Sequence, residues 1–165
     1  EDVLGGPGDG FKSAMSGVNG ARVYVAAMCA GLLADALEKA VAYGANRTTF
    51  GKTLLEHQGL KWSLAGVATE LEAMRTLTHA AGVLIDEGGD AVTRAAQAKK
   101  FATERAVSLI EACIQAMGAN GLREEYGLGR HLISAKILGY TDGSIEMMNE
   151  RIGAALTKEY SSSGA

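Results

Sequence analysis

Apolar residues recur every three or four positions along most of this sequence, and this helical periodicity constrains its fold more than any other feature. The first stripe consists of Val23, Ala26, Ala27, Ala30, Leu33, Ala34, Leu37 and Val41. The second consists of Leu60, Leu64, Val67, Leu71, Met74, Leu77 and Leu84, and the third of Val92, Ala95, Ala102, Ala106, Leu109 and Cys113. No alternating pattern of useful length suggests a strand, so the chain is expected to be helical throughout.

The stripes and the glycines between them predict where the helices lie. Long helices are expected over residues 19–44, 54–87 and 90–117, with Asp90 as a cap for the third. Shorter helices are expected over 11–18 and 129–138, and a last helix from about 144. Short links between long helices favour an all-α fold, an antiparallel four-helix bundle (up-down-up-down) with short extra helices. Their Ala- and Gly-rich surfaces permit close packing between copies, which favours an oligomer.

The ends of the sequence differ from its middle. Residues 1–10 are acidic and Gly-rich and lack an initiator Met, so they are expected to be a linker from a missing preceding domain. Residues 11–158 would form the bundle, and the Ser-rich residues 159–165 would form a flexible tail.

Composition excludes several classes of partner. The net charge is -3 and no basic block stands out, which argues against a nucleic-acid partner. No apolar run reaches the roughly 18 residues of a membrane helix, so no membrane span is expected. Cys29 and Cys113 lie on separate expected helices without metal-ligand spacing, and the three histidines also lack such spacing. We therefore expect no metal site and two buried thiols, as in a reducing compartment.

The turn after the first long helix is richer than a simple connection needs. It reads Arg47-Thr48-Thr49-Phe50-Gly51-Lys52 and combines cations, hydroxyls and an aromatic ring, which suits a large, flat, anionic ligand. The alternative is that Arg47 is only a cation at a helix C-terminus, where the helix dipole favours it.

Several motifs occur in the order and spacing of a known family. After Arg22 come the Arg47–Lys52 turn with Gln58, then Ala98-Lys99, then Gln115-Ala116-Met117-Gly118-Ala119-Asn120-Gly121, then Glu125-Tyr126 and Arg130, and finally Asp142-Gly143-Ser144-Ile145-Glu146. Together they resemble the C-terminal helical domain of the acyl-CoA dehydrogenases, FAD-dependent enzymes that oxidise acyl-CoA thioesters to 2-enoyl-CoA.

The resemblance implies a set of FAD contacts. Arg47 would face the FAD pyrophosphate of a neighbouring subunit, which suits a guanidinium fork that stays charged. The full set of implied cofactor residues is Arg47, Phe50, Gln58, Gln115, Gly118, Ala119, Gly121, Ser144 and Glu146. Ala119 replaces a family glycine, which is tolerable if its φ is negative. The alternative for this stretch is a plain glycine C-cap, and both interpretations can hold at once.

The resemblance also implies a catalytic base. Family members usually carry Glu-Gly-Thr where this chain has Asp142-Gly143-Ser144, so Asp142 would take the α-proton while the flavin accepts the β-hydride. Ala21 occupies the other family location of the base and cannot act as one. Arg22 and Gly143 are the implied substrate-binding residues. On sequence alone, the favoured interpretation of Asp142 is an N-cap of the last helix.

These implications define three functional hypotheses. The first is the C-terminal domain of an FAD-dependent acyl-CoA dehydrogenase, which contributes the base, part of the FAD site and the oligomer interface to a larger parent. The second keeps the fold but acts on a nitroalkane or a cyclic acyl-CoA. The third is a catalytically silent oligomerisation domain when the chain is isolated. The implied partners are an acyl-CoA substrate, an electron-transfer partner for the reduced flavin and further copies in a homodimer or homotetramer. The implied location is the bacterial cytoplasm or the mitochondrial matrix.

Overall fold

A computed structural model describes residue 6 and residues 8–161 of the chain. Five α-helices account for most of it: α1 (Gly10–Asn46), α2 (Gln58–Asp86), α3 (Val92–Met117), α4 (Leu128–Leu138) and α5 (Ile145–Ser161). The connections contain three short 3-10 helices, η1 (Leu54–Glu56), η2 (Gly118–Leu122) and η3 (Glu124–Tyr126), and the two-residue strands β1 (Thr48–Thr49) and β2 (Lys52–Thr53). The expected all-α class is therefore confirmed.

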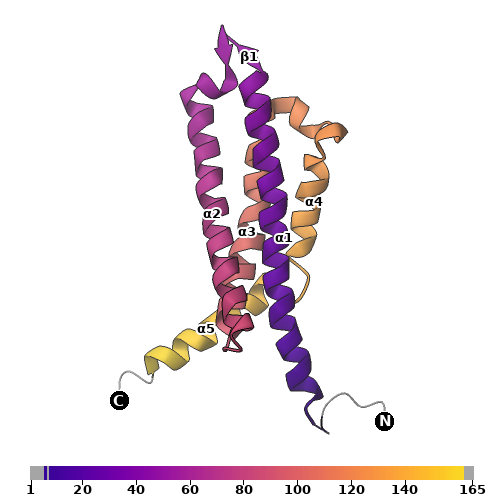
Figure 1. Cartoon of the computed structure of the whole chain (residues 1–165), viewed down its shortest axis with the longest axis vertical. Helices are drawn as coiled ribbons and strands as arrows, with labels where there is room; N and C mark the ends of the chain where they lie inside the picture. The colour runs from indigo at the N-terminus through magenta and orange to yellow at the C-terminus, as the bar shows by residue number, and fades with distance from the viewer. Residues whose placement is uncertain (1–5, 7, 162–165) are drawn as a thin grey trace.

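Helices α1 to α4 lie side by side, and the chain direction alternates from each to the next (Figure 1). Helix α3 is the central element, because it packs against α1, α2, α4 and α5. The short α4, rather than the last helix, takes the fourth position along the bundle. Helix α5 crosses the end of the bundle opposite the β1–β2 hairpin and points away from it (Figure 1).

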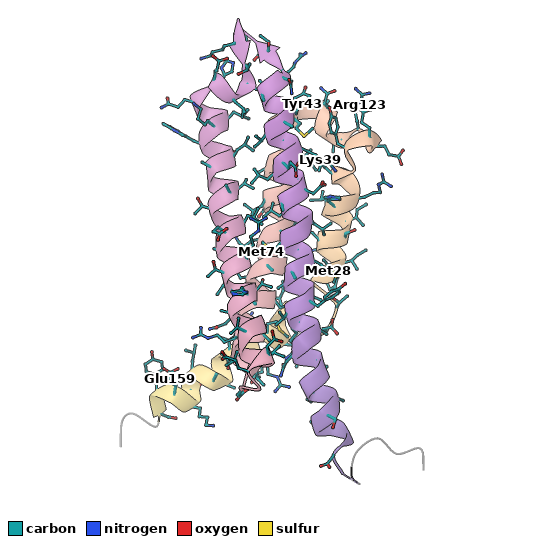
Figure 2. All side chains as sticks on the ribbon, in the orientation of Figure 1. Met28, Lys39, Tyr43, Met74, Arg123 and Glu159 are labelled. Atoms are coloured by element: carbon teal, nitrogen blue, oxygen red, sulfur yellow. The ribbon has the colours of Figure 1, made fainter. Side chains whose placement is uncertain are left out.

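The core is built from small side chains interleaved with a few large ones, and Figure 2 shows side chains filling the space between the helices. The buried residues of the three stripes include Ala26, Ala30, Leu33, Leu64, Val67, Leu71, Met74, Ala95, Ala102, Ala106 and Leu109, and Ile110 beside them is buried too. Alanine at these positions lets helix backbones approach closely, and Leu33, Met74 and Ile110 fill the remaining volume. Cys29 and Cys113 are buried free thiols, as expected, and burial raises the pKa of each to about 11.

The helix expected over 11–18 and the one expected over 19–44 are a single helix, so the predicted break between them was wrong. Gly17 and Gly20 lie in its first half, and a side chain at either position would meet open space. The Asn19 side chain accepts a hydrogen bond of 3.1 Å from Arg22 Nη1 instead of capping a new helix. Glycine and asparagine are weak helix formers, but their cost is small enough for a long helix to continue through them.

The other boundaries shift slightly. Asp90 lies one residue before the N-cap of α3, and its Oδ1 accepts a hydrogen bond of 3.1 Å from the Val92 N–H. Helix α5 continues to Ser161 rather than ending at 158. Most of the expected linker (residues 1–5 and 7) and the last part of the expected tail (162–165) lie outside the described residues.

Candidate functional site

The residues that the resemblance implies for the FAD and substrate sites lie at two opposite ends of the bundle. Helix α1 shows this directly, because it carries Arg22 near its beginning and ends beside Arg47. At 1.5 Å per residue these two positions are roughly 37 Å apart along the helix axis. We call the end with the β1–β2 strands the hairpin end and the end with Asp142 and Gly143 the carboxylate turn.

The hairpin end is tightly folded but presents its central side chain to solvent. Strand β1 pairs with β2 in antiparallel register, Thr49 opposite Lys52, so that Phe50 and Gly51 form a two-residue loop. Both loop residues have positive φ, 52° at Phe50 and 79° at Gly51, as a type I′ turn requires. A phenylalanine is costly in this conformation, and its ring is 97% exposed. The ring approaches that of His57 edge-on, with 6.4 Å between the ring centroids.

Arg47 is fixed through its backbone while its side chain is free. Its N–H donates to Tyr43 O at 2.9 Å, and its carbonyl accepts from the Leu54 N–H at 2.8 Å. Within residues 8–161 the exposed Arg47 guanidinium makes no hydrogen bond or ion pair. Gln58 is exposed in the first turn of α2. The hairpin end thus presents an unpaired cation, an aromatic ring and an amide.

The glycine segment at 118–121 lies at the same end. The Asn120 amide donates to Tyr43 Oη at 2.8 Å, which ties η2 to the last turns of α1. Gly118 ends α3 with φ 63°, as the C-cap alternative predicted, whereas Ala119 has no positive φ and is therefore unstrained. Gln115, Gly118 and Ala119 are exposed.

Close packing against α3 explains why residue 121 is a glycine. It is buried, and a Cβ there would lie 2.7 Å from Ile114 O and 2.9 Å from Ile114 Cα. No side chain fits so close to the backbone of α3. This glycine therefore serves the packing of η2 on α3, which is a different role from the cofactor contact that the family pattern implies.

The carboxylate turn connects α4 to α5. Asp142 has φ 51° and Gly143 has φ 101°, and the Asp142 side chain is exposed. The residue immediately before α5 is Ser144, so the interpretation of Asp142 as N-cap is not supported. A hydrogen bond from Ser144 lowers the pKa of the Glu146 carboxyl.

Two buried cations hold this turn from inside. Arg22, 5% exposed, donates from Nε to Asp142 O at 3.2 Å, and Lys99, fully buried, donates from Nζ to Gly143 O. Burial lowers the pKa of both side chains. Arg22 therefore faces the backbone of the turn rather than open solvent.

Our sequence interpretation quoted Lys99 only as part of a motif and missed it as a site residue. The signal was present, because Lys99 lies in the apolar stripe of α3 between Ala95 and Ala102. A lysine at a core position of an amphipathic helix indicates a buried partner.

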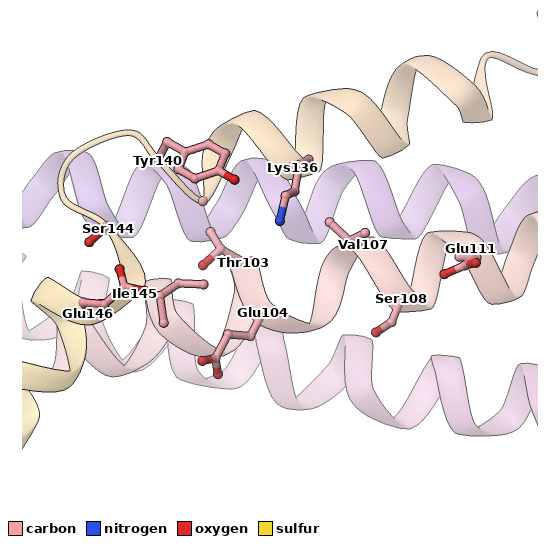
Figure 3. Close-up of a pocket in the computed structure, with 11 residues that line it drawn as sticks. Thr103, Glu104, Val107, Ser108, Glu111, Lys136, Tyr140, Ser144, Ile145 and Glu146 are labelled. Atoms are coloured by element: carbon pink, nitrogen blue, oxygen red, sulfur yellow. The ribbon is translucent and has the colours of Figure 1, made fainter.

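A groove of about 430 Å³ runs from the carboxylate turn along α3. Figure 3 shows Ser144 and Glu146 at one end of it, Glu104 near the middle, and Ser108 and Glu111 at the other end. Lys136 on α4 is the one cation among its lining residues. This hydroxyl- and carboxylate-rich lining suits ligand hydroxyl groups and disfavours phosphates.

The two ends carry complementary parts of what a flavin dinucleotide requires. The hairpin end offers a guanidinium for phosphates and an aromatic ring, and the groove offers acceptors for hydroxyl groups. The two ends are too far apart within one copy to hold the same molecule, so each end can supply only part of an FAD site.

The part of the chain that the structure describes lacks two further kinds of feature. No group of three or more His, Cys, Asp or Glu side chains there could hold a metal ion. Nor is any helix in that part of the chain both long and apolar enough to cross a membrane.

Comparison with known proteins identifies the family. The model of the "Acyl-CoA dehydrogenase, C-terminal domain" family matches residues 8–157. A short-chain specific acyl-CoA dehydrogenase from Megasphaera elsdenii is 36% identical over 96% of this chain and 41% of its own length. The short-chain specific acyl-CoA dehydrogenase, mitochondrial, of Homo sapiens is 35% identical over 98% of this chain and 39% of its own length.

Solved structures also resemble this chain in fold and sequence. A chain in the structure described as the electron transferring flavoprotein of Acidaminococcus fermentans superposes with a TM-score of 0.89 at 35% identity. The superposition covers 94% of this chain and 41% of that one. The chain belongs to the acyl-CoA dehydrogenase family and corresponds to its C-terminal domain. It spans about two-fifths of the length of the relatives it matches.

Proposed function

We propose that this chain is the C-terminal part of an FAD-dependent acyl-CoA dehydrogenase and that it supplies the base, part of the FAD site and the subunit interface. One observation carries the proposal: Asp142 presents an exposed carboxylate from a turn whose backbone is fixed by two buried cations. That turn stands beside a groove lined by Ser144 and Glu146.

Asp142 takes the α-proton of the thioester. Its backbone N–H is free to polarise the thioester carbonyl, which makes the α-proton more acidic. FAD, when bound, accepts the hydride from the β-carbon. Aspartate is one methylene shorter than glutamate, so its oxygens are set back by about 1.5 Å, one carbon–carbon bond. A displacement of this size strongly affects rate, so the substrate must approach the turn closely.

Arg47 serves the cofactor of a second copy. The exposed, unpaired guanidinium and the exposed Phe50 ring at the hairpin end support this assignment. Within one copy they are far from the groove at the carboxylate turn, so two copies are needed to assemble one site.

A flavin spectrum of the intact parent protein tests this function. We expect the yellow flavin absorbance of the parent to bleach on anaerobic addition of a short- or long-chain saturated acyl-CoA. A parent that binds no FAD and bleaches with no acyl-CoA would overturn the proposal. The isolated 165-residue chain is expected to be catalytically silent, and tight stoichiometric FAD in it would contradict that expectation.

Asp142 also favours a second candidate, a nitroalkane or cyclic acyl-CoA substrate. A substrate panel on the parent with wild type, Asp142→Asn and Asp142→Glu separates the two candidates. If saturated acyl-CoA oxidation improves in the Glu variant and the nitroalkane or cyclic substrate is preferred by wild type, the second candidate is correct.

The remaining assignments follow from the same proposal. This chain is similar to one in a structure whose description names an electron transferring flavoprotein. That similarity supports an electron transferring flavoprotein as the partner that reoxidises the flavin. The mitochondrial relative and the bacterial one support the mitochondrial matrix or the bacterial cytoplasm as the location.

A further inference from the structure

Lys99 lies where an apolar side chain would be expected. It is the largest fully buried side chain of the described chain, on the face of α3 that carries Ala95 and Ala102. Its ammonium group donates to Gly143 O. It forms no ion pair with any carboxylate in residues 8–161.

Burying this charge is costly. Desolvation and the nearby positive charge of Arg22 lower the pKa of Lys99, while Asp142 and Cys29 act in the opposite direction. Desolvation and repulsion from Arg151 likewise lower the pKa of Arg22, which Asp142 partly offsets. A methionine of similar length would fill the space without this cost, so packing alone does not explain a lysine.

The two cations act on consecutive peptide groups. Arg22 Nε binds the carbonyl of Asp142, and Lys99 Nζ binds the carbonyl of Gly143. In a trans peptide the C=O and the following N–H point in opposite directions. The N–H groups of Gly143 and Ser144 are therefore turned away from the bundle.

The exposed side of the turn is correspondingly unsatisfied. Among the residues that the structure describes, the N–H groups of Asp142 and Ser144 have no hydrogen-bond acceptor. Asp142 and Gly143 also hold positive φ angles, a conformation that the unconstrained chain would leave readily at Asp142. The turn therefore needs contacts from residues outside it, which keep these N–H donors and the Asp142 carboxylate on its exposed side.

We propose that Lys99 is a positioning residue for the reaction: by binding Gly143 O from inside the bundle it fixes the carboxylate turn, and with it the base and the N–H donors. The reaction part of this inference rests on the proposed function, whereas the hold on the turn does not. Lys99 itself touches neither substrate nor cofactor.

The hold is tested on the 165-residue chain by ¹⁵N relaxation of the Gly143 and Ser144 amides. In wild type we expect order parameters near about 0.85, as in rigid backbone, and in Lys99→Met values below about 0.6. The order parameter of the Ile110 amide in the core should be the same in wild type and Lys99→Met. Lys61→Met, which removes an exposed lysine of α2, is the matched control and should leave the turn rigid. Unchanged order parameters at the turn in Lys99→Met would overturn the proposal.

A second variant keeps the test informative if Lys99→Met does not fold. Lys99→Gln keeps a polar donor, but its amide nitrogen is one bond short of the ammonium position, so the turn is expected to loosen as in the Met variant. A rigid turn in Lys99→Gln would contradict the need for the ammonium group.

The effect on reaction is tested in the intact parent. Lys99→Met is expected to lower kcat roughly 10- to 100-fold, as for a misplacement of about 1 Å, with little change in KM. Lys61→Met should match wild type. A loss confined to KM, or unchanged kcat, would overturn the positioning role. If the wild-type parent oxidises no acyl-CoA, the proposed function fails, and the relaxation measurement still decides whether Lys99 holds the turn.

Discussion

The hairpin end and the carboxylate turn both place a non-glycine residue in the left-handed region, but they hold it in different ways. At the hairpin end Phe50 has φ 52° and is 97% exposed, and its ring approaches that of His57 edge-on. At the carboxylate turn Asp142 has φ 51°, and its backbone is bound by Arg22 while its neighbour is bound by Lys99.

The difference indicates which end is held in place by contacts within this chain. The carboxylate turn is braced by buried groups of α1 and α3, as a catalytic group must be if its position is to be reproducible. The hairpin end exposes an aromatic ring and an unpaired guanidinium, which are side chains typical of an interface before its partner is in place. We therefore interpret one end as completed from within and the other as completed by another copy.

The largest expected effect is at the carboxylate turn. Asp142→Asn in the intact parent should lower kcat by about 10² to 10⁴-fold, because a positioned base contributes that much. Stopped-flow bleaching of the flavin by acyl-CoA measures it. Asp86→Asn, which alters an exposed aspartate at the end of α2, should leave the rate unchanged. Equal rates in wild type and Asp142→Asn would exclude Asp142 as the base.

Arg47 should matter for the cofactor and not for the fold. Arg47→Gln is expected to weaken FAD binding in the parent by roughly 10- to 100-fold, the value of a hydrogen bond to a charged group. The free energy of unfolding of the chain should change by less than about 0.5 kcal/mol, because the Arg47 side chain is exposed and has no partner within residues 8–161. Lys52→Gln removes a charge from the same hairpin and should cost less, since ammonium cannot bind two phosphate oxygens in a fork. Equal losses would show a general charge effect instead.

The glycine segment should respond through packing. Gly121→Ala is expected to reduce the free energy of unfolding by about 1–3 kcal/mol, because its Cβ would press on the α3 backbone at Ile114. Gly66→Ala is the control: it lies in the exposed interior of α2 with open space around it and should stabilise by roughly 0.5–1 kcal/mol. Urea unfolding measures both. A neutral Gly121→Ala would mean that η2 can move away from α3 freely.

The smallest expected effect is at the hairpin tip. Phe50→Asn should stabilise the isolated chain by about 1 kcal/mol, because asparagine tolerates positive φ better than phenylalanine does. The same variant should weaken cofactor binding in the assembled parent. Loss of stability in the isolated chain would indicate that the Phe50–His57 contact outweighs the backbone strain.

The sequence predicted the fold well where periodicity decides it. The three apolar stripes located α1, α2 and α3, and the glycines at 88–89 and 118 marked two helix ends. It failed at 18–19, where weak helix formers suggested a break, but α1 continues through them and Asn19 accepts a hydrogen bond from Arg22. It also did not predict the two-residue strands, because so short a pairing has no periodic pattern.

Sequence motifs name candidate site residues, which stay predictions, but they do not show how these residues are arranged within one copy. Motif order pointed to Arg47 and Asp142, yet their placement at opposite ends follows from the length of α1 and the path of the chain through the bundle. The roles of Lys99 and Gly121 depend on contacts across long sequence separations, which spacing along one chain cannot reveal.

Subunit complementation tests the central claim, that the two ends belong to one site only across copies. The intact parent would be prepared as Arg47→Gln and as Asp142→Asn, and the two variants would be unfolded, refolded together and assayed at an FAD concentration too low to load the Arg47→Gln protein. If Arg47 of one copy serves the site of Asp142 in the other, half the dimers are mixed and each mixed dimer has one intact site. We predict recovery of about a quarter of wild-type acyl-CoA oxidation. Activity no higher than that of the separate variants would contradict the account.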